Sequence, residues 1–213
     1  MRLIAFFTAA LLLPLVSSPA GSESESVSYF DQRPESLKAR RIVEKIEGQD
    51  IEFLALQGPI TFVLSSIPGY QLENETTPGA SVTFRHRSVS ALMDFSLYRE
   101  SNFPLERTVA DAEQHIQALM RAFEATHEVE MISISDPSQR IYDRYFGQKP
   151  FNVVYQVTEK VAADGQIPVE FIYHECWLTL EGHVLVITLK AEKERYRGLL
   201  SQATRIWKDG SFR

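Results

Sequence analysis

The sequence has very little cysteine: Cys176 is the only one among 213 residues. A single thiol cannot form an internal disulfide, so the folded chain must be held together by its apolar core. Long apolar segments are also scarce. Outside the N-terminal segment, no run reaches the roughly eighteen consecutive apolar residues that a membrane-spanning helix requires.

The sequence also lacks the motifs that identify common catalytic mechanisms. The chain has no G-x-S-x-G, G-x-x-x-x-G-K-[ST], H-E-x-x-H or G-x-G-x-x-G pattern. Serine hydrolase, P-loop and zinc-protease chemistry are therefore unsupported, and we expect no catalytic residues and no cofactor. The formal net charge of −6 argues against general binding to nucleic acids or anionic membranes.

The N-terminus shows the three regions of a secretory signal peptide. Arg2 provides the charged start, and the apolar run 3–16 follows it. Ser18 and Ala20 are small residues at the positions that a cleavage site before Gly21 requires. We therefore expect an exported protein, periplasmic or extracellular, that is soluble and keeps no transmembrane span after cleavage.

Cleavage at this site divides the chain into three parts. Residues 1–20 are the predicted signal peptide, residues 21–33 a flexible leader too polar to fold, and residues 34–213 a single domain. The domain is expected to begin with a helix around residues 35–47, where apolar residues recur at an imperfect helical spacing. Gly48 is predicted to end this helix.

Alternation of apolar and polar residues predicts strands along much of the domain. The expected strands are residues 51–56, 60–64, 81–87, 93–98, 131–134, 151–161, 167–180 and 183–191. Short glycine-containing turns separate the last three, which predicts an antiparallel meander. In the strand 81–87, alternation divides the basic cluster Arg85, His86 and Arg87 between two faces, which favours a solvated edge over an anion site.

Two further helices are expected. Thr108 and Asp111 resemble a capping box, and the apolar residues after them recur at helical spacing. His115 and Arg121 lie off this stripe and are predicted to be solvated. A second apolar stripe, ending at Trp207, predicts a C-terminal helix across the sheet. The elements together predict an α+β fold in which a mid-chain helix and a C-terminal helix pack an antiparallel sheet.

The stretch FIYHECWLTL, residues 171–180, brings His174, Glu175 and Cys176 together in an apolar segment. In a strand, His174 and Cys176 share one face. Two such residues are not a metal site, because structural zinc takes four ligands and catalytic zinc three plus water. Apolar surroundings also disfavour the reactive thiolate. We interpret Cys176 as a buried core residue and expect no metal here, while metal handling through His174 and Cys176 stays a weaker hypothesis.

Two features leave alternatives open. Tyr142, Tyr145 and Phe146 form either a ligand platform or a cover over the core, and we favour the core. Asn74 begins a glycosylation sequon, which matters only if the source is eukaryotic.

The order of elements resembles the PsbP-like superfamily. The resemblance covers about residues 50–210 and rests on ITFVLSSIPGYQLE, on the mid-chain helix, on the runs FNVVYQVTEKV, VEFIYHECWLTL and HVLVITLKA, and on the closing helix. It implies an exported α+β domain with an antiparallel sheet between helices and a role as a binding or assembly partner of other proteins. It carries over no catalytic residues, and the expected helix at 35–47 is not part of the family pattern.

These observations favour a non-catalytic extracytoplasmic binding or assembly module whose partner is another protein or an envelope component. Such a module should carry an aromatic or apolar patch on its surface. The alternative is a small exported enzyme or ligand carrier, which should show a pocket with convergent polar groups. The sequence indicates neither the partner nor the oligomeric state.

Overall fold

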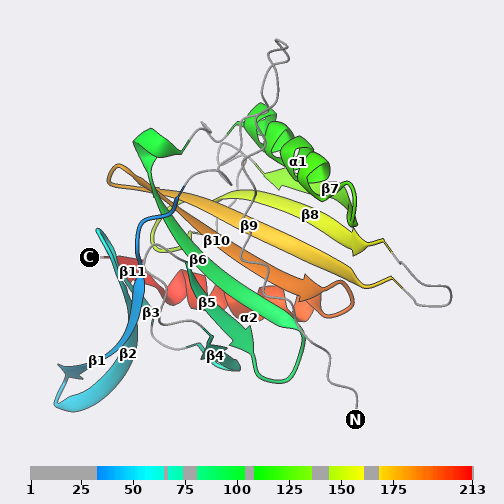
Figure 1. The fold of residues 1–213 in the computed structure, drawn as a ribbon. Helices are drawn as coiled ribbons and strands as arrows, with labels where there is room; N and C mark the ends of the chain where they lie inside the picture. Colours follow the sequence, from blue (N-terminus) through cyan, green and yellow to red (C-terminus); the bar gives the residue numbers. More distant parts are fainter. Residues whose placement is uncertain are drawn as a thin grey trace.

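A computed structural model describes residues 33–64, 67–73, 81–103, 108–135, 144–160 and 168–212. The predicted signal peptide, nearly all of the predicted leader, the sequon at Asn74 and Tyr142 lie outside these residues. Within the described ranges the chain forms two antiparallel sheets and two α-helices (Figure 1). This confirms the predicted α+β class.

The larger sheet has seven strands in the order β4-β5-β6-β10-β9-β8-β7. Their bounds are β4 Tyr70–Leu72, β5 Val82–His86, β6 Ala91–Arg99, β7 His127–Ser135, β8 Phe151–Glu159, β9 Glu170–Leu180 and β10 His183–Glu192. The predicted meander is confirmed, since β8, β9 and β10 pair consecutively and antiparallel. The turn between β9 and β10 needs positive φ at Glu181 (41°) and Gly182 (78°), which fits a two-residue hairpin turn.

The smaller sheet has the order β1-β2-β3-β11. It consists of β1 Lys38–Ile46, β2 Gln49–Gln57, β3 Thr61–Leu64 and β11 Ser211–Phe212. The helix predicted around residues 35–47 is therefore wrong, because these residues form a strand. The β-branched residues Ile42, Val43 and Ile46 favour strand backbone, and Gly48 closes a hairpin with β2 instead of ending a helix.

The mid-chain helix α1 spans Val109–Phe123, and the C-terminal helix α2 spans Tyr196–Asp209. The predicted capping box is present: Asp111 N–H donates to Thr108 Oγ1 at 3.2 Å, and Thr108 N–H donates to Asp111 Oδ2 at 3.0 Å. The prediction that His115 is solvated is wrong, since this side chain is fully buried. No described helix is long and apolar enough to cross a membrane.

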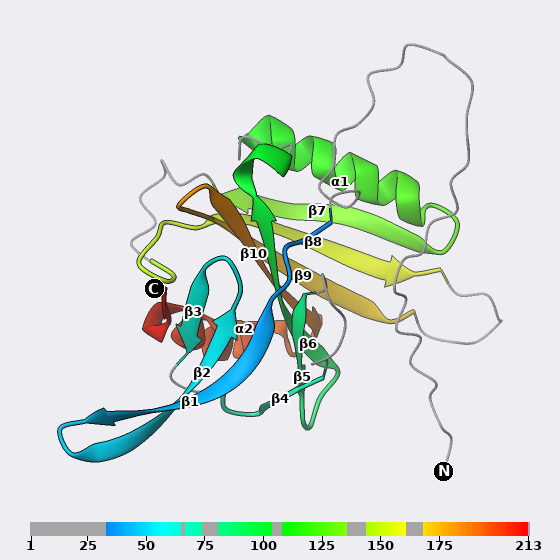
Figure 2. The same ribbon diagram turned by 60° about the vertical axis from the view of Figure 1, so that its left-hand side comes forward.

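The two helices cover opposite faces of the seven-stranded sheet (Figure 2). The helix α1 packs Ala112, Ile116 and Leu119 on one face, against aromatic residues that include Trp177. On the other face, α2 and the four-stranded sheet enclose a larger core that contains Trp207. The central strand β9 is thus buried on both faces, as its sequence predicted.

Candidate functional site

The hairpin of β1 and β2, here called the arm (residues 38–57), projects from the body of the molecule in both ribbon views (Figures 1 and 2). Nine consecutive residue pairs join its strands. Its turn has positive φ at Glu47 (49°) and Gly48 (83°), the backbone of a two-residue hairpin turn. Near its base, Leu54 and Leu56 contact the larger core, whereas the tip reaches beyond it.

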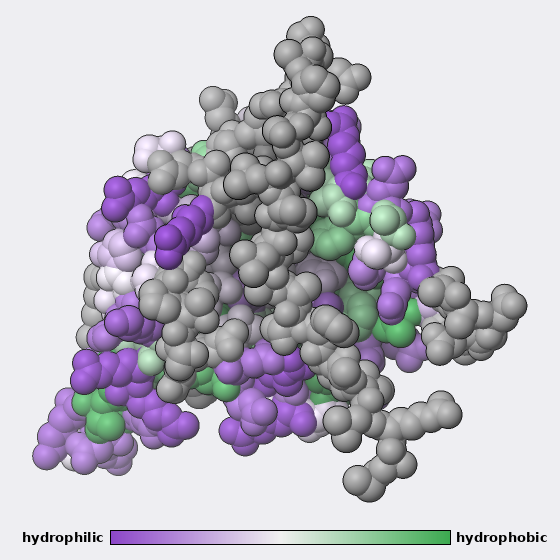
Figure 3. Space-filling model, viewed as in Figure 1, coloured by the Kyte–Doolittle hydropathy of each residue, from purple (hydrophilic) through white to green (hydrophobic). Residues whose placement is uncertain are grey.

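One face of the arm carries apolar residues that belong to neither core cluster. Ile42 and Phe53 lie directly opposite each other, and Ile46 and Ile51 follow on the same face toward the turn. These four residues are called the apolar face of the arm. Ile46 is 41% exposed and Ile51 38% exposed. Figure 3 shows a hydrophobic patch framed by hydrophilic residues at the lower left, where Figure 1 places the arm; clustered exposure of this kind marks interaction surfaces.

The outer strand of the arm is basic. Among the described strands β1 pairs only with β2, so it forms one edge of the smaller sheet. It carries four basic residues and one acidic residue, a net charge of +3, in a chain whose total is −6. Arg41 donates to Glu52 of β2 at 3.0 Å, and both side chains are more than half exposed. The arm therefore combines a basic outer strand with an exposed apolar face.

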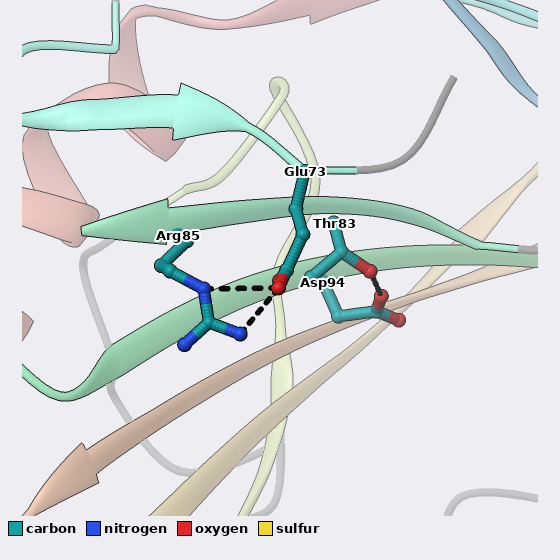
Figure 4. Close-up of polar contacts among 4 residues, drawn as sticks. All are labelled: Glu73, Thr83, Arg85 and Asp94. Atoms are coloured by element: carbon teal, nitrogen blue, oxygen red, sulfur yellow. Dashed lines mark hydrogen bonds and ion pairs between the residues drawn. The ribbon is translucent and has the colours of Figure 1, made fainter. Parts of the chain in front are cut away.

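A second polar group consists of Glu73, which directly follows β4, and of side chains on β5 and β6 (Figure 4). Arg85 donates to Glu73 from Nε at 2.9 Å, and Thr83 donates to Asp94 Oδ1 at 2.6 Å. Ser96 donates to the other oxygen of Asp94 at 2.9 Å. Burial raises the pKa of Asp94, and the hydroxyl donors oppose that rise. These side chains satisfy one another's hydrogen-bonding groups, and their contacts link neighbouring strands of the sheet.

The basic cluster at residues 85–87 does not converge on one site. Arg85 faces Glu73, whereas the ring of His86 contacts Tyr70 edge-on at 4.9 Å on the other face of the sheet. Arg87 is exposed. The predicted division of this cluster between two faces is confirmed.

The FIYHECWLTL stretch places Cys176 and His174 in a buried hydrogen-bonded network under α2. Cys176 Sγ donates to Asn152 Oδ1 at 2.9 Å, and His174 Nε2 donates to the same oxygen at 3.0 Å. Tyr196 then donates to His174 Nδ1 at 2.8 Å. Burial lowers the pKa of His174 to about 4, which keeps the ring neutral. Burial, aided by the charge of Glu175, raises the pKa of the Cys176 thiol well above its ordinary value.

The neighbouring carboxylate forms a separate network on the opposite face, under α1. Glu175 accepts from Tyr155 Oη at 2.7 Å and from Trp177 Nε1 at 2.9 Å. His115 Nε2 lies 3.3 Å from its second oxygen. Burial alone would raise the pKa of Glu175, but the charge of His115 and the three donors outweigh burial and hold that pKa below its usual range.

Both networks lie inside the protein. The prediction that Cys176 is a core residue with His174 beside it is confirmed: Cys176 is fully buried and His174 is 8% exposed. In the described part of the chain no group of three or more histidine, cysteine or acidic side chains could hold a metal ion. These contacts connect strands and helices, and they present no reactive atom at the surface.

A shallow, open depression of about 550 Å³ lies at one end of the seven-stranded sheet. Its lining residues are Pro59, Arg99, Glu100, Ser101, Gly182 and His183. Arg99 of this lining forms an ion pair with Glu35. This open surface does not resemble the enclosed pocket with convergent polar groups that an enzyme or carrier should show.

Tyr145 and Phe146, the two described members of the predicted aromatic group, belong to the core. Tyr145 is 5% exposed and contacts Trp207 with ring centroids 5.2 Å apart. Phe146 is 1% exposed and contacts Phe62 edge-on at 5.8 Å. The interpretation of these two residues as a cover over the core is confirmed.

Sequence reasoning missed two features of this molecule. The arm was missed because its first strand was predicted to be a helix; the β-branched residues Ile42, Val43 and Ile46, followed by Glu47-Gly48, were the available signal. The network of Glu175 was missed because its partners come from other elements. Trp177, two residues away on the same strand face, was the one donor visible in the sequence.

Comparison with known proteins gives likenesses of fold. No protein-family model matches the sequence, and a search of curated proteins finds no match. Among solved structures, the chain is similar to PsbP (CyanoP) from Synechocystis sp. PCC 6803, with 14% identity, coverage of 92% of this chain and 97% of that chain, and a TM-score of 0.41.

Two other solved structures are similar to the chain. The Ran-binding protein Mog1p of Saccharomyces cerevisiae has 11% identity and a TM-score of 0.44, with coverage of 83% of this chain and 96% of that chain. LpqN of Mycobacterium tuberculosis, involved in cell envelope biogenesis, has 10% identity and a TM-score of 0.37, with coverage of 83% and 91%. At these identities and scores the likenesses support no statement about activity or partner.

Proposed function

We propose that this protein is an extracytoplasmic, non-catalytic module that binds another protein of the cell envelope through its arm. The observation that carries the proposal is the apolar face of the arm, which projects from the body and contacts neither core cluster. Exposing such a surface is unfavourable in water, so its presence is best explained by a partner that covers it.

The placement of the reactive side chains supports a binding role over a catalytic one. Cys176 and Glu175 are each 1% exposed or less, and their polar atoms are occupied by internal partners. A nucleophile or a general base must reach a substrate, and neither of these groups does. The arm, by contrast, places its residues where a second protein can contact them.

Export is the part of the proposal that rests on the sequence. The charged start, the short apolar run and the small residues Ser18 and Ala20 support cleavage before Gly21. Intact-mass analysis of the protein from its native host should give an N-terminus near Gly21. A retained Met1 on a membrane-integrated species would contradict export.

The binding role can be tested with a photo-crosslinking amino acid in living cells. Placed at Val43, which is 66% exposed on the arm, the probe should give one dominant protein adduct. The matched control is Met120, a 48% exposed apolar residue on α1, which should give no such adduct. Equal crosslinking from both positions, or none from Val43, would contradict the proposal.

The adduct then allows a direct binding measurement with the purified partner. Ile46→Thr combined with Ile51→Thr keeps β-branched side chains but reduces the apolar face of the arm, so affinity should fall by about tenfold or more. Val169→Thr, at a 43% exposed position outside the arm, is the control and should bind like the wild type. An equal loss of affinity in both variants would show that the arm has no special role in binding.

A further inference from the structure

The free edge of β1 offers backbone groups that no described strand uses. The two-residue turn at Glu47–Gly48 makes Ile46 and Gln49 a hydrogen-bonded pair, and such pairs alternate along an antiparallel hairpin. Val43 is therefore at a position whose N–H and C=O point away from β2. An edge of this kind is a ready template for an added strand.

The charges on β1 indicate what such a strand must carry. Arg41, Val43 and Lys45 project from one face, and Ile42 and Ile46 from the other. With a net charge of +3 on β1 and −6 on the whole chain, the remaining residues carry −9. The arm as a whole has no net charge, because Glu44, Glu47, Asp50 and Glu52 balance its four basic residues. Its outer edge is nevertheless basic, and a basic edge favours an acidic segment beside it.

The same charges disfavour a second copy of this chain as the occupant. Two copies of β1 would bring two strands of net charge +3 into contact. Like charges opposite each other destabilise strand pairs, and basic residues on edge strands are a common device against self-pairing. A partner segment of opposite charge avoids this repulsion.

We propose that β1 binds an extended acidic segment of the partner protein by strand addition, the segment alternating acidic and apolar residues. Its acidic side chains lie beside Arg41 and Lys45, while its apolar side chains extend the apolar face of the arm beyond Ile42 and Ile46. Backbone hydrogen bonds come from the outward-facing positions, including Val43. This inference rests on the proposed function, since it specifies what the arm recognises.

A labelled synthetic peptide of nine residues, the length of β1, provides the test. A peptide alternating valine and glutamate should bind the full protein in fluorescence anisotropy. Peptides alternating valine with lysine, or serine with glutamate, should bind about tenfold more weakly or not at all, because one lacks the charge and the other the apolar side chains. Equal binding of all three peptides would overturn the inference.

Two pairs of variants separate strand addition from simple electrostatic attraction. Val43→Pro removes an outward N–H and should abolish binding, whereas Val43→Thr keeps the donor and should bind within about threefold of the wild type. Arg41→Gln with Lys45→Gln should weaken binding by about tenfold. Lys193→Gln with Arg195→Gln removes the same charge outside the arm and should have little effect on peptide affinity. An equal loss of affinity in this control would mean that only the net charge of the protein matters.

Circular dichroism and urea midpoints confirm that each variant is folded before its binding is interpreted. If Val43→Pro does not fold, the paired glutamine variants decide the question alone. If the arm crosslinks to an envelope protein but that protein binds Val43→Pro as well as the wild type, strand addition fails while the proposed function stands. If sedimentation shows that the protein dimerises through β1, the choice of an acidic partner is wrong.

Discussion

Replacing His174 by glutamine should remove much of the acid sensitivity of folding. The ring is 8% exposed, donates to Asn152 and accepts from Tyr196, an arrangement that only the neutral imidazole can make. Burial lowers the pKa of His174 to about 4. Glutamine can also donate and accept at this position, and it does not titrate.

The expected size follows from proton linkage. In the unfolded chain a histidine has a pKa of about 6.5, so its ring is protonated below that pH. In the folded protein the ring of His174 stays neutral down to about pH 4, so acid favours the unfolded state. The contribution of His174 to stability is therefore complete above about pH 6.5 and is lost as the pH falls. Between about pH 7 and pH 4 the loss amounts to about 3 kcal/mol.

Urea unfolding at a series of pH values measures this effect. The stability of the wild type should fall by about 3 kcal/mol more than that of His174→Gln between about pH 7 and pH 4. His183→Gln, at the exposed β9–β10 turn, is the matched control and should follow the wild type. Parallel curves for the wild type and His174→Gln would refute the account of a buried neutral imidazole.

Three further predictions concern the two cores. Cys176 should resist a thiol reagent in the folded protein and react after denaturation, because burial disfavours the thiolate; rapid labelling of the native protein would contradict its place in the core. Trp207→Ala should lower the free energy of unfolding by about 3–5 kcal/mol, since this ring is fully buried, and an unchanged denaturation midpoint would mean that α2 does not pack there. Glu175→Gln should cost about 1–3 kcal/mol, because three buried donors lose a charged acceptor; wild-type stability would show that the network is unimportant.

The parts of the fold that depend on local pattern could be predicted from the sequence. The meander and α2 were found because alternation and helical spacing of apolar residues directly reflect burial on one face. The capping box at Thr108 and Asp111 is a local contact and was found for the same reason. Cys176 was assigned correctly because its apolar neighbours lie on its own strand.

The predictions that are wrong concern residues whose structure depends on contacts with other segments of the chain. The helix predicted at residues 35–47 is wrong because the apolar residues of KARRIVEKI recur at helical spacing, whereas their pairing with β2 makes them a strand. His115 is polar and lies beside the apolar stripe of α1, so it was assigned to solvent; its burial depends on Glu175, sixty residues away. Pairings over such a distance leave no periodic signal in the sequence.

The most direct test of the arm as the binding element is hydrogen exchange along β1. The amide exchange of residues 38–46 would be measured in the protein alone and in complex with the envelope protein captured through Val43. The account predicts that exchange slows at the outward-facing positions, including Arg41, Val43 and Lys45, while α1 is unaffected. Unchanged exchange along β1, with new protection on another element, would contradict it.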